Sequence, residues 1–270
     1  MTTTLLVDLG GTRIKSALLT SPSDVSAVTH GGDWRSAVRT VVQRSGADEV
    51  ALCVPGLVKD GRVAYLPGKL PEIVDADLAA VFGVRVLLVV NDAVAYGVGE
   101  CRGGAGAGAD RVVVVTLGTG VGVAVVEHGA PLGTGPWGGG ILGGQLVVAA
   151  AGGTFEACCR AAALVAAVPG ARDVEEAYAL LAAGNAAAAQ GFSGVRAVLV
   201  RGLVALSMAH APDVVVVGGG ACQAGLLDGV QESVEAGLWP GQSVSVRSAE
   251  LGDASALVGL AALLRAQVAA

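Results

Sequence analysis

The chain has 270 residues, 15% of them charged, and its 17 basic against 23 acidic residues give a net charge of −6. A surface for nucleic acid or anionic membranes needs clustered lysine and arginine, and no such cluster occurs in the sequence, so we expect neither partner. The apolar residues are mostly alanine and valine interrupted by glycine, and no basic segment precedes the first strand pattern, so we expect no membrane span, no signal peptide and a cytoplasmic location.

Strand and helix patterns alternate through the first part of the chain. Residues 4–9 and 14–19 are apolar runs joined by a glycine turn, which predicts a hairpin. Asp33 is a candidate N-cap for the helix that follows. The next expected elements, in order, are a helix over 34–46, a strand over 50–54, a helix over 72–82, a strand over 84–90 and a helix over 93–101.

A segment of glycine and alanine over 102–110 is the expected junction between two lobes. The opening pattern then returns, since strands over 111–117 and 121–126 again flank a glycine turn. The remaining expected elements are helices over 153–167, 173–183 and 189–210, a strand over 213–217, a helix over 223–236, a short strand at 244–246 and a terminal helix over 254–270. This alternation predicts an α/β protein with a mixed sheet in each lobe.

The octapeptide from Asp8 to Lys15 combines an acidic residue with the first glycine turn. Gly10 and Gly11 let the backbone turn tightly and present N–H groups to a phosphate without a Cβ in the way. The hydroxyl of Thr12 can donate to the same phosphate, and Lys15 completes the candidate phosphate-binding set. Asp8 can hold Mg²⁺ directly or through water. An ordinary hairpin turn is the alternative interpretation.

A second turn of the same kind consists of Gly118, Thr119 and Gly120. Two such turns at equivalent places in two lobes would face each other across a cleft, where they could hold the phosphates of a nucleotide from both sides. The Gly-x-Gly-x-Gly spacing also occurs in dinucleotide-binding turns. That fingerprint requires a helix after the turn, however, and here a valine-rich strand follows.

A carboxylate follows the apolar strand over 84–90, in the sequence Asn91-Asp92-Ala93. Ligands of α/β sheets bind at the carboxyl ends of strands. A carboxylate there can accept the proton of an attacking hydroxyl during phosphoryl transfer, and Asn91 can bind neighbouring hydroxyls. Both residue types are also favoured as helix N-caps, which is the alternative. Beside the two glycine turns, we interpret Asp92 as a general base.

A third glycine turn, Gly218-Gly219-Gly220, follows the strand over 213–217 and opens into a helix pattern. A turn without side chains leaves room for an adenine ring or a ribose to approach the backbone.

These four motifs, in this order and spacing, resemble those of the ROK family of sugar kinases, within the sugar-kinase/Hsp70/actin superfamily. Asp8-x-Gly-Gly-Thr resembles the first phosphate motif, Leu-Gly-Thr-Gly the second, Asn91-Asp92-Ala93 with Gly99-Glu100 the catalytic-base segment, and Val-Gly-Gly-Gly the adenosine motif. Pro55-Gly56 and residues 67–70 fit the family's substrate loop. The resemblance covers almost the whole chain.

The resemblance implies a two-lobed actin-like ATPase (ribonuclease H-like) fold, with a mixed sheet flanked by helices in each lobe. It places ATP and Mg²⁺ in the cleft and makes Asp92 the base that activates a sugar hydroxyl. The expected N-terminal lobe, residues 1–107, carries the substrate loop and the base, and the helix over 254–270 packs back on it. The expected C-terminal lobe, residues 108–253, binds the nucleotide.

The sequence departs from the family where a Glu-x-Gly-His segment usually contacts sugar hydroxyls. Leu142 stands at the Glu position and Gln145 at the His position, and Lys69 replaces the Asn of the substrate loop. The expected substrate-binding residues are Gly56, Lys69, Asn91, Gln145 and Glu156. These changes favour a cyclitol, a deoxy or amino sugar, or an acceptor with an anionic group over a plain hexose.

Lys69 could instead be a solvated loop charge. A second residue with two interpretations is Trp137, in the sequence Gly135-Pro-Trp-Gly-Gly, which could stack on an apolar ring face or simply anchor the core.

The zinc-binding cysteine segment of the family is missing, because no cysteine occurs between the second glycine turn and Cys158. The chain has 5 cysteines, without a Cys-x-x-Cys pair, and we expect them to be reduced and mostly buried. The three histidines, His30, His128 and His210, belong to no ligand-like constellation and are expected to be surface or packing residues. The expected cofactors are therefore ATP and Mg²⁺, without zinc.

Three other functions are alternatives to an ATP-dependent kinase. Sugar-sensing regulators of the family carry an N-terminal DNA-binding helix-turn-helix, and a first strand at Thr4 leaves no room for one. A degenerate sugar- or nucleotide-binding relative would not need Asp8, both phosphate turns and Asp92. A polyphosphate-dependent kinase stays open, although the turn at 218–220 favours a nucleotide. Related kinases are often dimers, so the resemblance also suggests a homodimer.

Overall fold

The computed structural model describes residues 2–66, 68–133, 140–149 and 152–269. Its framework is a pair of five-stranded mixed sheets with one shared topology. In the N-terminal sheet the order is β3-β2-β1-β4-β7, and in the C-terminal sheet it is β10-β9-β8-β11-β12. Each begins with an antiparallel meander and adds two parallel strands. The repeated strand–turn–strand pattern in the sequence is therefore a repeat of fold topology.

The strands of the N-terminal sheet are β1 (Thr4–Leu9), β2 (Arg13–Leu18), β3 (Ser26–Thr29), β4 (Glu49–Val54) and β7 (Arg85–Asn91). Those of the C-terminal sheet are β8 (Arg111–Leu117), β9 (Val121–Glu127), β10 (Ala130–Pro131), β11 (Val214–Gly218) and β12 (Ser245–Ser248). A small hairpin of β5 (Leu57–Lys59) and β6 (Arg62–Tyr65) stands apart from both sheets.

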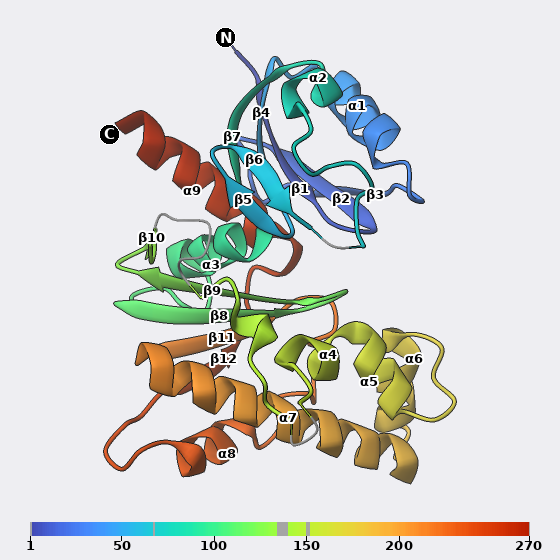
Figure 1. The fold of residues 1–270 in the computed structure, drawn as a ribbon, viewed down its shortest axis with the longest axis vertical. Coiled ribbons are helices and arrows are strands. Elements are labelled where there is room, and N and C mark those ends of the chain that lie inside the picture. The colour runs from blue at the N-terminus through green and yellow to red at the C-terminus, as the bar shows by residue number, and fades with distance from the viewer. Residues whose placement is uncertain (1, 67, 134–139, 150–151, 270) are drawn as a thin grey trace.

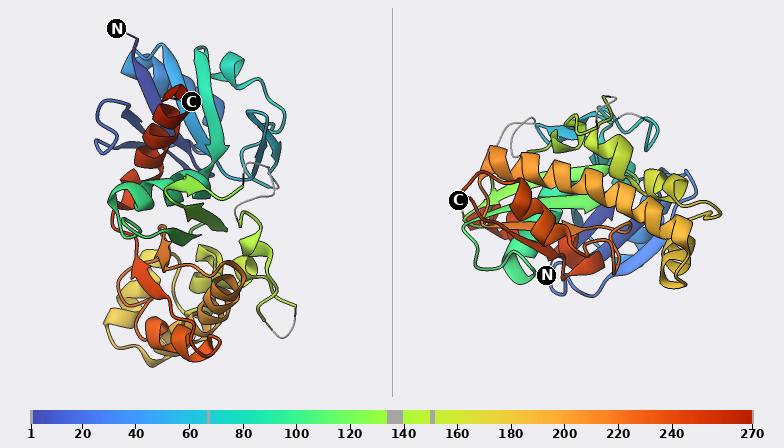
Figure 2. Two further views of the ribbon diagram at one scale, coloured as in Figure 1. Left: turned by 90° about the vertical axis from the view of Figure 1, so that its left-hand side faces the viewer. Right: turned by 90° about the horizontal axis from the view of Figure 1, so that it is seen from below.

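Helices cover both faces of each sheet and form a stack of layers (Figure 1). The helices of the first half are α1 (Trp34–Ser45), α2 (Leu78–Phe82) and α3 (Asp92–Gly103). Those of the second half are α4 (Phe155–Cys159), α5 (Ala161–Ala167), α6 (Val174–Ala182), α7 (Ala186–His210), α8 (Val230–Gly237) and α9 (Ser255–Ala269). Figures 1 and 2 show α3 and α9 between the two sheets, so the terminal helix returns to the N-terminal half.

Successive side chains of the central strands point to opposite faces of the sheet, and helices bury both faces. In β8, Val113 and Val115 pack with helices α4–α8, whereas Val112 and Val114 face α3. In β1, Leu5 and Val7 face α1 while Leu6 packs against α9. Valine-rich strands of this kind are typical of sheets covered on both sides.

The layer between the sheets depends on glycines that let α3 and α9 approach closely. A Cβ on Gly99 of α3 would collide with the carbonyl of Ser255, and one on Gly259 of α9 with the carbonyl of Ala95. The helices therefore meet backbone to backbone. The helix α3 begins at Asp92, directly after the last strand of the N-terminal sheet, and packs along β8 and β9 of the C-terminal sheet. It therefore contacts both halves of the chain.

Three expected helices are shorter or broken in the structure. Residues 72–77 form a loop, in which Glu72 and Asp75 have positive φ, and α2 begins only after the N-cap Asp77. The helix over 153–167 breaks at Arg160, next to a backbone hydrogen bond from Ala161 to Gly118. The helix expected from 223 begins at Val230.

Other differences concern short elements and the glycine-alanine segment. The strands β3, β5, β6 and β10 are too short and too exposed to give a clear pattern. Of the glycine-alanine segment over 102–110, the first two residues end α3 and the others form a turn that leads to β8, in which Ala105 is buried.

One described helix, α7, is long and apolar enough to span a membrane by length and composition alone, with a mean hydropathy of 1.5. Its buried residues Phe192, Leu199 and Leu203 instead pack into the core beneath the C-terminal sheet. This packing accounts for its apolar character.

Candidate functional site

A cavity of about 950 Å³ lies between the two sheets and brings most of the expected site residues together. The lining includes Asp8, Gly10, Gly11, Lys15, Gly56, Lys69, Asn91, Asp92, Gly118, Thr119, Gly120, Gln145, Glu156 and Gly219. Thr12, Gly218 and Gly220 are not part of this lining, although each is adjacent in sequence to a residue that is. Trp137 lies outside the described residues.

Sheet register explains why the acidic residues meet. In the parallel part of the N-terminal sheet, Asp8 pairs with Cys53 of β4, and Val54 pairs with Asn91 at the end of β7. The carboxyl ends of β1, β4 and β7 therefore reach the same edge, where ligands of α/β sheets bind. This edge faces the second glycine turn across the cavity.

The first glycine turn is held by a hydrogen bond within the turn and by two contacts with His30. The N–H of Gly10 donates to the carbonyl of Arg13 at 3.0 Å. On the outer side, Nε2 of His30 lies 3.1 Å from the carbonyl oxygen of Gly10, and the backbone N–H of His30 donates to Thr12. His30 is therefore a buried packing residue that fixes this turn.

Asp8 lies at the end of β1, beside the first turn, with Lys15 and Cys53 as neighbours. Its carboxylate is 3.7 Å from the ammonium of Lys15 and 3.6 Å from the thiol of Cys53. Burial raises the pKa of Asp8 above its ordinary value, and the charge of Lys15 opposes this. Lys15 also pairs with Asp253 at 2.9 Å, just before α9.

The carboxylate of Asp8 suits Mg²⁺ bound mainly by phosphate oxygens and water. Among the described residues, no group of three His, Cys, Asp or Glu side chains could hold a metal by itself. Mg²⁺ usually keeps several waters and uses one or two carboxylates together with substrate phosphates. Asp8 beside the glycine turn provides one such carboxylate.

The second glycine turn is held by its own backbone and by α4 and α5. The N–H of Gly118 donates to the carbonyl of Gly120 at 2.9 Å, and the carbonyl of Gly118 accepts from Ala161 at 2.7 Å. At the end of the turn, Oε2 of Glu156 accepts from the N–H of Val121 at 3.2 Å. Glu156 thus lines the cavity while it also supports the turn.

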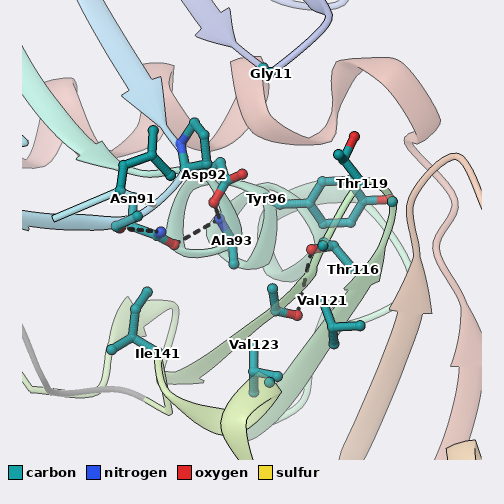
Figure 3. A pocket seen from close by; sticks show the side chains of 18 of the residues that line it. Gly11, Asn91, Asp92, Ala93, Tyr96, Thr116, Thr119, Val121, Val123 and Ile141 are labelled. Carbon is teal, nitrogen blue, oxygen red and sulfur yellow. Dashed lines mark hydrogen bonds between the residues drawn. The ribbon is translucent and has the colours of Figure 1, made fainter. Parts of the chain in front are cut away.

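Asn91 caps α3, and Asp92 is the first residue of that helix. Oδ1 of Asn91 accepts from the N–H groups of Ala93 and Val94, and its Nδ2 donates to the carbonyl of Gly56 at 2.9 Å. The capping interpretation is therefore right for Asn91, and only part of its amide remains available to a ligand. Asp92 accepts from the N–H of Ala93 at 2.8 Å and lines the cavity below Gly11 (Figure 3).

The surroundings of Asp92 raise the pKa of its carboxyl group. Burial and then the nearby carboxylate of Asp8 raise the pKa of Asp92 to about 6, while the N–H of Ala93 and the charge of Lys69 oppose the shift. A carboxylate with a raised pKa is a stronger base once it is ionised, and such groups are concentrated at functional sites.

If Asp92 acts as a base in the free enzyme, kcat/KM for the acceptor should rise with pH through about 6 and level off above it. The protonated carboxyl cannot accept a proton, so activity is lost as the pH falls below this pKa. Initial rates at a series of pH values on both sides of 6 test this, with circular dichroism at each pH as the folding control. A profile that stays flat through this range would contradict the assignment.

Tyr96 was not predicted from the sequence and lies at the opposite end of the cavity from Asn91. Figure 3 shows Asn91 and Ile141 at one end and Thr119 with Tyr96 at the other. A Cβ on Gly218 would collide with the hydroxyl of Tyr96, and Gly219 has a φ of +91°. The third glycine turn therefore packs directly on this tyrosine. Only the helical spacing from Asp92 to Tyr96 could have suggested it.

The end of the cavity near Asn91 has an apolar wall. Ile141 lies at this end with Asn91 (Figure 3). The lining of the cavity also includes the apolar residues Leu57, Tyr65, Leu66, Val123 and Leu142, together with Gly56 and Gln145. Gly56 has a φ of +89°, and a Cβ there would collide with the carbonyl of Tyr65. Leu142 and Gln145, which occupy the positions of the expected Glu and His, both line the cavity. The polar side chains of the lining that could bind hydroxyls are therefore bordered by apolar ones.

Comparisons with known proteins give one consistent picture. A family model described as ROK family matches residues 4–267. A ROK family glucokinase from Streptomyces griseus, solved with glucose and AMPPNP, is 25% identical, with a TM-score of 0.83 over 98% of this chain and 99% of that one. A ROK hexokinase from Thermus thermophilus is 26% identical, with a TM-score of 0.75 over 99% of each chain.

A third solved structure has inorganic polyphosphate in its name beside ATP. The inorganic polyphosphate/ATP-glucomannokinase from Arthrobacter sp. strain KM is 23% identical, with a TM-score of 0.69 over 99% of this chain and 100% of that one. No curated protein sequence matches the chain significantly. The matched chains have the two-lobed actin-like ATPase fold expected from the sequence motifs.

Proposed function

Because the chain belongs to the ROK family, we propose that it is a kinase that transfers the γ-phosphoryl group of ATP to a hydroxyl of a sugar or sugar-like acceptor. One observation carries this proposal: both phosphate turns and the carboxylate of Asp92 line the same cavity. The glucose and AMPPNP in the Streptomyces griseus glucokinase support the same pair of substrates.

In the proposed reaction, the oxygen of the acceptor hydroxyl attacks the γ-phosphorus and the bond from that phosphorus to the oxygen of ADP breaks. The hydroxyl proton passes to Asp92. The N–H groups of Gly10 and Gly118 are bonded within their own turns, so the N–H groups that follow them, at Gly11 and at Thr119–Gly120, hold the phosphates. Gly219 beside Tyr96 leaves room for the nucleoside. Asp8 would hold Mg²⁺, which neutralises phosphate charge when bound.

The apolar wall narrows the class of acceptor. A hexose with all hydroxyls exposed would leave several of them unpaired against Ile141, Leu142 and Val123, and an unpaired buried polar group costs free energy. A cyclitol, or a deoxy or otherwise modified sugar with an apolar edge, avoids this cost. We therefore expect such acceptors to have higher kcat/KM than plain hexoses.

Two alternatives rest on specific observations. Leu142 and Gln145 at the positions of sugar-contacting residues favour a degenerate, non-catalytic relative that binds sugar or nucleotide. The Arthrobacter glucomannokinase, whose name includes inorganic polyphosphate, favours a polyphosphate donor. We prefer ATP because the turn around Gly219 borders the cavity beside Tyr96, whereas a polyphosphate chain needs no nucleoside site. A cytoplasmic location, the lobe boundaries at 107/108 and 253/254, and a homodimer remain part of the proposal.

A phosphate-acceptor screen tests the proposed function. The purified chain is incubated with MgATP, and in parallel with Mg-polyphosphate, against hexoses, N-acetyl sugars, deoxy and amino sugars, and cyclitols, and phosphorylated products are identified by mass spectrometry. We expect turnover with MgATP on at least one acceptor. Turnover with polyphosphate but not with MgATP would show that polyphosphate is the phosphoryl donor. Absence of any product, together with measurable nucleotide or sugar binding, would support the degenerate alternative and overturn the kinase function.

A further inference from the structure

Lys69 spans the gap between the two phosphate turns. Its Cδ lies 3.4 Å from the position that a Cβ would take on Gly11, and its Nζ lies 3.1 Å from the corresponding position on Gly120. One side chain therefore has its stem against the first turn and its ammonium against the second. The path between Gly11 and Gly120 is also the path that a triphosphate held by both turns would follow.

The loop that carries Lys69 is held in a strained conformation. Leu70 is 3% exposed and has a φ of +43°, although it precedes a proline, which restricts its backbone further. The loop is tied to α1, because Nε1 of Trp34 donates to the carbonyl of Pro71 at 3.1 Å and Arg35 donates to that of Glu72 at 2.7 Å. Strain of this kind persists only where the surrounding structure enforces it, and it is concentrated at functional sites.

The charges around Lys69 leave its ammonium available. None of the ion pairs within the described part of the chain includes Lys69, whereas Lys15 is already shared between Asp8 and Asp253. On the second turn, Oε2 of Glu156 lies 2.7 Å from the Cβ position of Gly120 and is used by the N–H of Val121. The half-buried ammonium of Lys69 therefore forms no salt bridge within the described residues and can bind an anion.

Resting on the proposed kinase function, we propose that Lys69 binds the phosphoryl group during its transfer, rather than an anionic group of the acceptor. As the bond from the acceptor oxygen to phosphorus forms and the bond from phosphorus to ADP breaks, negative charge spreads over the three equatorial oxygens. The ammonium beside Gly120 stabilises this charge. The donor is favoured over the acceptor because the side chain of Lys69 packs against the Cβ positions of Gly11 and Gly120, which belong to the two turns that are proposed to hold the phosphates.

Nucleotide binding and turnover by Lys69→Met and Lys69→Arg test this inference. Calorimetry with MgAMP-PNP and with MgADP shows whether Lys69 interacts with the third phosphate, without the need for an acceptor. We expect Lys69→Met to weaken MgAMP-PNP binding by about tenfold or more, the scale of one charged hydrogen bond, while MgADP binding changes little. With a neutral acceptor, kcat should fall by about 10²–10³-fold at nearly constant acceptor KM, and Lys69→Arg should recover part of it.

Lys59→Met is the matched control, because Lys59 is an exposed lysine on β5 of the same region. Its binding and turnover should equal those of the wild type, and thermal melting confirms that all variants are folded. Equal affinity of Lys69→Met and wild type for MgAMP-PNP with unchanged kcat would overturn the inference. So would a rise in KM confined to anionic acceptors. Wild-type protein that binds neither nucleotide would instead overturn the proposed ATP-dependent function, and this inference with it.

Discussion

Replacement of Asp92 by asparagine is expected to lower kcat by about 10²–10⁴-fold on any acceptor that the wild type phosphorylates, because the attacking hydroxyl loses its general base. The helix should stay intact, since asparagine keeps the oxygen that accepts from the N–H of Ala93 and is itself a favoured residue at helix starts. The substitution also removes the repulsion between Asp92 and the carboxylate of Asp8 that helps to raise the pKa of Asp92.

The Asp92→Asn variant is therefore expected to have a lower kcat and an unchanged affinity for the nucleotide. Steady-state kinetics with the acceptor found in the screen, and calorimetry with MgAMP-PNP, separate the two. Asp24→Asn, at an exposed aspartate outside the cavity, is the control and should behave as the wild type. Full activity of Asp92→Asn would show that another group takes the proton. A matching loss of nucleotide affinity would instead point to a role in phosphate binding.

The glycine turns and the acidic residues could be found from the sequence because their signals are local. Gly10-Gly11 and Gly118-Thr119-Gly120 each interrupt a pair of valine- or leucine-rich runs, so the hairpins and their turns follow from short-range pattern. Asp92 follows directly after an apolar strand, which places it at a known edge of the sheet. The alternation of strands and helices predicted a mixed sheet in each half, and the strand pairing confirms it.

What could not be predicted depends on contacts between distant segments. Tyr96 reaches the third glycine turn only because α3 crosses from one sheet to the other. The helix over 153–167 breaks at Arg160 beside the contact with Gly118, and a helical pattern within one segment contains no trace of that contact. In the sequence, Lys69 is indistinguishable from an exposed loop lysine. Its position across the cavity depends on the burial of Leu70 and on the hydrogen bond from Trp34 to the carbonyl of Pro71.

Glu100 shows the same limit most clearly, because its sequence position suggested only a family motif. Its carboxylate is fully buried in α3. Oε1 accepts from the N–H of Leu251 at 3.0 Å and the hydroxyl of Ser255 at 2.7 Å. Oε2 accepts from the N–H groups of Ala105 at 3.0 Å and Glu250 at 3.1 Å. One side chain thus connects α3, the turn before β8, the segment after β12 and the start of α9.

Replacement of Glu100 by alanine is expected to lower the free energy of unfolding by at least about 3 kcal/mol, because each buried donor left without an acceptor costs about 1–3 kcal/mol. Three backbone N–H groups and one hydroxyl would lose their acceptor, and each buried donor without a partner is costly. Glu100→Gln should cost less, because the amide keeps one oxygen acceptor, but its NH₂ group would face donors on the other side. Urea unfolding measures both differences.

Glu232→Ala is the control, since Glu232 is an exposed glutamate in the first turn of α8, and surface changes of this kind are usually within about 0.5 kcal/mol of neutral. A Glu100→Ala variant as stable as Glu232→Ala would show that water or a rearranged turn satisfies the four donors. If the expected loss is found, MgAMP-PNP should recover part of it, because a ligand bound only by the folded state stabilises that state. Glu100 anchors the helix that carries Asp92 and Tyr96, so the stability of this buried network and the geometry of the proposed active site are expected to change together.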